Sequence, residues 1–224
     1  AGLLAATELL QDGEDMARAR QYREQATAMG NAIENSLSAS RHIRATDALP
    51  ASPYRRMDAG AIGSLAASYP LQLLPPEDPR VLATVDYLQQ ASWVHGAFFQ
   101  NMVHSGLNAY LTLHVAQVLL RAGRPEFQEA VQAVVDLASP TGQWPEAIHP
   151  RTHGGCMGDG QHVWAAAEFV VMLRNMFVRH EDQTLILGSG IFPEWLQPGA
   201  VLRFGPAPTP FGPISLEVEA QAEQ

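Results

Sequence analysis

The residues best suited to chemistry are concentrated between Gly142 and Glu168. Carboxylate, histidine and tryptophan side chains alternate there with glycine and proline. Aromatic rings stack on the C–H faces of sugars, and carboxylates accept hydrogen bonds from sugar hydroxyls. The stretch therefore favours a carbohydrate site, whose candidate residues are Trp144, Glu146, His149, His153, Asp159, His162 and Trp164.

Cleavage of a glycosidic bond needs two carboxyl groups. One protonates the leaving oxygen, and the other activates water or attacks the anomeric carbon. Glu146 is the candidate catalytic carboxylate, the alternative being an ordinary loop carboxylate. Trp144 is either a sugar platform or a plug of the loop, and Trp164 is either a core residue or a ligand contact. Glu168 is expected to cap or brace the loop rather than to touch substrate.

The same stretch contains residue types that bind zinc. His149, His153, Cys156 and His162 follow one another at short intervals. Their spacing matches no standard zinc pattern, so histidines that bind hydroxyls or brace the loop are favoured over a metal-dependent protein. We expect neither a metal nor another cofactor.

Two further segments carry candidate residues. The aromatic-rich connection 91–104 and the start of the next helix contribute the candidate sugar contacts Trp93, Gln100, His104 and Asn108, with Ser105 as a candidate N-cap. Asp58 is expected to cap a helix that begins at Ala59. The alternatives are a rim carboxylate that binds a sugar hydroxyl and a carboxyl group that serves as the acid.

The elements that must position these residues are mainly helical. Apolar spacing, proline and glycine predict helices over 2–38 with a break at Gly13, 59–69, 79–90, 105–121, 125–137 and 161–179. The last of these is apolar over most of its surface, so we expect it to be buried. Short β-type runs follow at 184–187, 200–204 and 214–218. These patterns divide the chain into a helical domain over 1–182, a small β appendage over 183–219 and a disordered tail over 220–224.

Three motifs together resemble the C-terminal part of six-hairpin (α/α)6 glycosidases, most closely the glycogen-debranching and α-glucosidase groups. The motifs are Gly142-Gln143-Trp144-Pro145-Glu146, Gly154-Gly155-Cys156 and His162-Val163-Trp164-Ala165-Ala166-Ala167-Glu168, and residues 190–195 resemble the start of the β region that follows such barrels. The resemblance covers roughly residues 100–219. The glycine-rich loop is longer than in debranching enzymes, and His162 stands where they often have glutamine.

This resemblance implies a mainly α fold, with helical hairpins forming part of an (α/α)6 toroid and a small C-terminal β segment. It also implies that Glu146 is the general base of an inverting hydrolysis and that Trp164 lies under the site. The family's general acid lies farther upstream than this chain extends. We therefore expect the chain to be a fragment that lacks the acid. A non-catalytic carbohydrate-binding or structural helical domain is the alternative.

Composition disfavours several classes of binding partner. The net charge is −9 and every basic residue is arginine, which disfavours nucleic acid and anionic membranes. One cysteine permits no internal disulfide, and no apolar run is long enough to span a bilayer. We expect an oligosaccharide or glycoside substrate, a cytoplasmic location, and association either with another copy or with the missing N-terminal half of the same protein.

Overall fold

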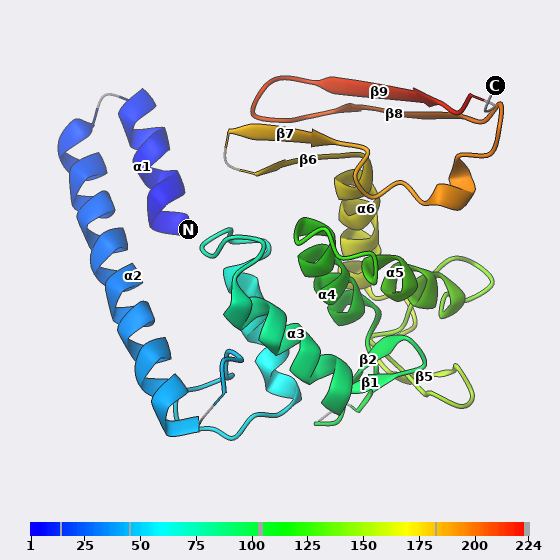
Figure 1. The fold of residues 1–224 in the computed structure, drawn as a ribbon, viewed down its shortest axis with the longest axis horizontal. Helices are drawn as coiled ribbons and strands as arrows, with labels where there is room; N and C mark the ends of the chain where they lie inside the picture. Colours follow the sequence, from blue (N-terminus) through cyan, green and yellow to red (C-terminus); the bar gives the residue numbers. More distant parts are fainter. Residues whose placement is uncertain (14, 45, 103–104, 182, 222–224) are drawn as a thin grey trace. The chain divides into compact units, whose positions relative to one another are not determined.

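The computed structural model describes residues 1–13, 15–44, 46–102, 105–181 and 183–221. The chain forms two compact units, Ala1–Leu88 and Gln89 onward (Figure 1). The fold is mainly α with a small antiparallel β part, as predicted. Residues 222–224 of the predicted tail and His104 lie outside the described residues.

The first unit begins with the helical hairpin α1 (Gly2–Asp12) and α2 (Met16–Arg44). The predicted break at Gly13 is confirmed, and α2 continues past the predicted end at residue 38. The next predicted helix is a 3₁₀ helix, η1 (Ala59–Ala67), and α3 (Pro79–Ala91) follows it. The backbone N–H of Leu49 donates to Thr84 Oγ1 at 2.7 Å, which ties the preceding loop to α3.

The second unit is built on α4 (Ala109–Arg121), α5 (Phe127–Asp136) and α6 (Val163–Phe177). Helix α4 packs against both α5 and α6, and most of its side chains are buried. Tyr110 contacts Trp164 near one end of α4, and Gln117 contacts Glu168 farther along it. Helices α4 and α6 are therefore parallel, and their N-terminal ends lie at the same end of the unit.

A five-stranded antiparallel sheet lies at that end and joins the two long loops (Figure 1). Its strands, in order, are β1 (Trp93–Val94), β2 (Ala97–Gln100), β3 (Gly106–Leu107), β4 (Ala147–Ile148) and β5 (Gly155–Met157). Leu107 pairs with Ile148, which links residues about 40 positions apart in the chain. The loops 91–104 and 138–160, which carry most candidate residues, are thus held together by one sheet.

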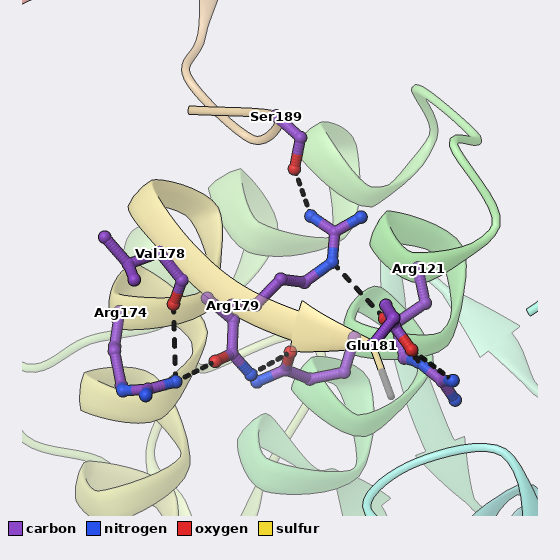
Figure 2. A network of polar contacts seen from close by, with 8 residues as sticks. Arg121, Arg174, Val178, Arg179, Glu181 and Ser189 are labelled. Atoms are coloured by element: carbon purple, nitrogen blue, oxygen red, sulfur yellow. Dashed lines mark hydrogen bonds and ion pairs between the residues drawn. The ribbon is translucent and has the colours of Figure 1, made fainter. Parts of the chain in front are cut away.

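The C-terminal part consists of two hairpins. Strand β6 (Val178–Glu181) pairs with β7 (Thr184–Leu187), and β8 (Val201–Ala207) pairs with β9 (Ile214–Glu219). A 3₁₀ turn, η2 (Pro193–Trp195), lies between them. Figure 2 shows how β6 is anchored: the Glu181 carboxylate accepts hydrogen bonds from the guanidinium groups of Arg121 and Arg179.

Three helix predictions were wrong in detail. Helix α4 begins at Ala109, and Ser105 precedes strand β3 instead of capping the helix. Helix α6 ends at Phe177 because the chain there turns into β6. Its expected burial is also wrong, since Val163 is 78% exposed and Val170 is 65% exposed.

Among the described residues, none of the helices combines the length and apolar character needed to cross a membrane.

Candidate active site

An aromatic cluster forms where the first turns of α4 and α6 meet. Tyr110 and Trp164 are stacked, with ring centroids 4.5 Å apart and planes at 29°. The His162 ring contacts Tyr110 edge-on, with centroids 4.9 Å apart. Tyr110 is buried, but Trp164 is 58% exposed. The interpretation of Trp164 as a core residue is therefore wrong, because much of its indole is open to solvent.

Glu146 lies directly before strand β4 and two residues after Trp144, whose carbonyl accepts a hydrogen bond from the backbone N–H of His162 at 2.8 Å. Its side chain is half-buried, and Gly158 lies opposite it, one residue after β5. A Cβ atom on Gly158 would stand 3.2 Å from Glu146 Cβ. Burial raises the pKa of Tyr110, and the Glu146 carboxylate raises that pKa further. Glu146 thus shares its surroundings with the Tyr110 hydroxyl.

Two buried polar atoms at the same helix ends have no hydrogen-bond partner among the described residues. They are Asn108 Oδ1, directly before α4, and His162 Nδ1, directly before α6. Asn108 is 1% exposed, so bulk water does not solvate it. An unpaired buried polar atom costs about 1–3 kcal/mol. Such atoms are suited to binding a polar ligand or an ordered water molecule.

Trp144 has a different environment from Trp164. It is 5% exposed, and its Nε1–H donates to the carbonyl of Val134 at 2.8 Å. Its ring packs against Phe169 with centroids 5.1 Å apart. Because both the ring and its donor are used inside the fold, the structure favours a plug that fixes the loop to α5 over a sugar platform.

Three other predicted contacts lie on the exposed part of the 138–160 loop. His149 Nδ1 accepts hydrogen bonds from the backbone N–H groups of Arg151 and Thr152, each at 3.3 Å. The backbone N–H of His153 donates to the His149 carbonyl, and Asp159 Oδ1 accepts from the N–H of Gln161 at 2.9 Å. His149 and Asp159 therefore brace the loop. The described residues contain no group of three or more candidate metal ligands.

The remaining predicted residues are divided between the two units. Trp93 pairs with Phe98 and Gln100 pairs with Gly106 within the sheet, where both candidates are half-buried. Asp58 belongs to the first unit. Its Oδ1 accepts from the N–H of Gly60 at 2.9 Å, which confirms the N-cap geometry. Arg55 Nε also donates to this carboxylate, at 2.6 Å.

Sequence reasoning missed Tyr110, which looks like one more core position of an apolar helix. It also left open the partner of Glu168. The Gln117 side chain is fully buried, donates to Glu168 Oε1 at 3.2 Å and accepts from Asn175 Nδ2 at 3.0 Å. Burial raises the pKa of Glu168, while the hydrogen bond from Gln117 opposes this rise. The carboxyl braces α6 against α4, and no signal in the sequence identified this partner.

Comparison with protein-family models and with curated proteins finds no match. Solved structures of glycosidases share the fold. A wild-type glycosidase matches at 17% identity and a TM-score of 0.53, and a glycosidase variant in complex with glucose matches at 16% and 0.53. Each match covers 72% of this chain and 47% of the other. The chain thus spans about half the length of the glycosidases whose fold it shares.

Proposed function

We propose that this chain is part of a glycoside hydrolase and that Glu146 is the general base of an inverting hydrolysis. The observation that carries the proposal is the grouping of Glu146 with Tyr110, His162 and Trp164 at the N-terminal ends of two parallel helices. A half-buried carboxylate, an exposed indole and unpaired polar atoms supply the three kinds of contact that a sugar requires. The glycosidase fold of the structural neighbours supports the same reading.

In this proposal, Glu146 accepts a proton from a water molecule as the water attacks the anomeric carbon. The glycosidic bond breaks, and the leaving oxygen receives a proton from a general acid. The exposed part of Trp164 supports one sugar ring, and Tyr110 holds the indole from behind. Asn108 Oδ1 accepts a hydrogen bond from a sugar hydroxyl or from a bound water.

We propose further that the general acid lies outside residues 1–224, as the resemblance implies. The assay therefore uses the complete product of the gene, with residues 1–224 tested alongside it. Glu146→Gln in the complete product removes the base while conserving shape, and turnover should fall by about 10²–10⁴-fold. A glucoside panel with several linkages is the substrate set, because one structural neighbour holds glucose.

A second variant tests the base role directly. In Glu146→Ala, added azide can attack without giving up a proton, so a glycosyl azide of inverted anomeric configuration should form and be visible by NMR. Undiminished turnover in Glu146→Gln would refute the role of Glu146. Binding of sugars without turnover by the wild-type complete product would instead establish a non-catalytic carbohydrate-binding protein.

A further inference from the structure

A cleft of about 1170 Å³ lies along the exposed side of α5, away from the residues grouped around Glu146. Three segments far apart in sequence close it: the β1–β2 turn at His95 and Gly96, the loop at 150–153, and η2. The β1–β2 turn approaches α5 closely, since a Cβ atom on Gly96 would stand 3.0 Å from Ala133 Cβ. Clefts of roughly 300–1,000 Å³ hold ligands of drug size, so this one has room for several sugar rings.

Part of the lining is polar, and this part both donates and accepts hydrogen bonds. Gln128 and Gln132 present amides, and His95 and His153 present ring nitrogens. Three carboxylates, Glu129, Asp136 and Glu194, outnumber the single guanidinium of Arg151, which disfavours an anionic ligand. A neutral ligand with many hydroxyl groups satisfies such a mixture of donors and acceptors.

One wall of the cleft is aromatic. Phe192 and Trp195 are stacked with centroids 4.8 Å apart, and both rings are half-exposed. Phe127 supports Phe192 from α5, edge-on at 6.1 Å. This wall offers apolar surface to the C–H groups of a sugar, next to side chains that bind its hydroxyls.

A smaller groove of about 510 Å³ adjoins the cleft and shares Asp136, Leu137 and His153 with it. This groove reaches Pro145, the residue before Glu146. The hollowed surface therefore runs from η2 along the end of α5 to the rear of the loop that carries Glu146. Glu146, Tyr110 and Trp164 line neither hollow.

We propose that the cleft between α5, the β1–β2 turn and η2 is a second saccharide-binding site, which holds a neutral oligosaccharide of several units. The class of ligand rests on the proposed function, but binding at this cleft does not require Glu146. The site would keep a long substrate on the protein while one of its ends is cleaved elsewhere.

The test uses the indole N–H signals of the tryptophans in ¹⁵N NMR spectra, with Trp195→Phe and Trp164→Phe used only to assign two of them. The probes are neutral hexasaccharides of glucose, mannose and xylose, added to the Glu146→Gln protein so that none is cleaved. At least one hexasaccharide should shift the Trp195 signal with saturation. A monosaccharide should shift Trp195 far less, because it fills little of the cleft.

The cleft variant combines Gln132→Ala with Glu194→Ala. The control variant is Gln90→Ala. Both sets change exposed side chains, but Gln90 lies outside the cleft. The cleft variant should bind the hexasaccharide about tenfold more weakly by the Trp195 signal, and the control should bind unchanged. The complete gene product that carries the cleft substitutions and retains Glu146 should hydrolyse a short aryl glycoside at the normal rate.

The outcomes separate the two proposals. If no hexasaccharide shifts Trp195, or if oligolysine shifts it and the sugars do not, the cleft is not a saccharide site. If Trp195 shifts and the cleft variant weakens binding while the complete product hydrolyses nothing, the second site stands and the hydrolase proposal fails.

Discussion

Tyr110 and Trp164 stack 4.5 Å apart, although one belongs to the first turn of α4 and the other to the first turn of α6. The stack fixes two parallel helices at the end where the five-stranded sheet gathers both long loops. It also holds an exposed indole against Tyr110, the residue whose pKa the Glu146 carboxylate raises. Packing and the candidate chemistry therefore depend on the same ring.

Replacing Tyr110 by Ala should lower the free energy of unfolding by about 3–5 kcal/mol, because the ring is 8% exposed and its removal leaves a cavity. Tyr110→Phe keeps the stack and should cost less than about 1.5 kcal/mol. Urea denaturation measures both. Tyr54→Ala is the control, since that ring is 93% exposed and should contribute within about 0.5 kcal/mol. Equal effects at positions 110 and 54 would mean that the stack contributes nothing to stability.

Gly158→Ala should disturb Glu146, whereas Gly142→Ala should not. Both glycines have positive φ, at 78° and 75°, so both substitutions should cost about 1 kcal/mol of stability. Only Gly158 faces Glu146, at 3.2 Å from its Cβ, while a Cβ at Gly142 meets open space. If the proposed hydrolysis is correct, kcat/KM should fall about 10–100-fold in Gly158→Ala alone. The same loss in both variants would point to backbone strain rather than to displacement of Glu146.

Helix positions were largely predictable, because local signals set them. Gly13 separates α1 from α2, and the side chain of Asp58 caps η1 as the pattern of residues indicated. The five-stranded sheet was not predictable. Its strands are as short as two residues, and the pairing of Leu107 with Ile148 depends on contacts across the fold.

The candidate site shows the same division. The sequence identified candidate residues both in the loop containing Glu146 and in the 91–104 connection, but their pairing in one sheet came only from the structure. It did not show that Trp144 is buried and Trp164 exposed, because the exposure of a side chain depends on neighbours far away in the chain. Trp144 is covered by Phe169 and Val134, and Trp164 has its indole open to solvent. Tyr110 was missed because nothing local distinguishes it from the core residues around it.

Glu168→Gln should stabilise the protein at neutral pH and leave it unchanged near pH 3. Burial raises the pKa of this carboxyl above its ordinary value. As pH rises, the unfolded chain therefore loses this proton first, and stability falls until the folded pKa is passed. Glutamine carries no charge and avoids this loss. Melting temperatures across pH 3–8 should show an advantage of the variant that grows as pH rises toward the folded pKa and reaches a few degrees above it.

Glu77→Gln is the control for that series, because its side chain is exposed. Its melting curves should follow those of the wild type at every pH. A Glu168→Gln protein that is less stable than wild type at pH 7 would show that the hydrogen bond from Gln117 outweighs the cost of burying the charge.

Glu181→Gln should be among the most destabilising single changes in the second unit. The Glu181 carboxylate lies between two buried guanidiniums, and the side chains of Arg121 and Arg179 are 4% and 9% exposed (Figure 2). Arg121 donates to it at 2.6 and 2.8 Å, and Arg179 also donates to Ser189 Oγ in the turn after β7. Removing the negative charge leaves two like charges buried together, which should cost about 3–5 kcal/mol in urea denaturation.

Glu217→Gln is the matched control, since it breaks the ion pair with Arg203 on the β8–β9 hairpin, where both side chains are largely exposed. Water solvates these charges whether or not they are paired, so no measurable change is expected. The comparison isolates burial as the cause, because each variant exchanges one carboxylate for an amide beside arginine. If both variants unfolded at the same urea concentration as wild type, Glu181 would not anchor β6 to α4.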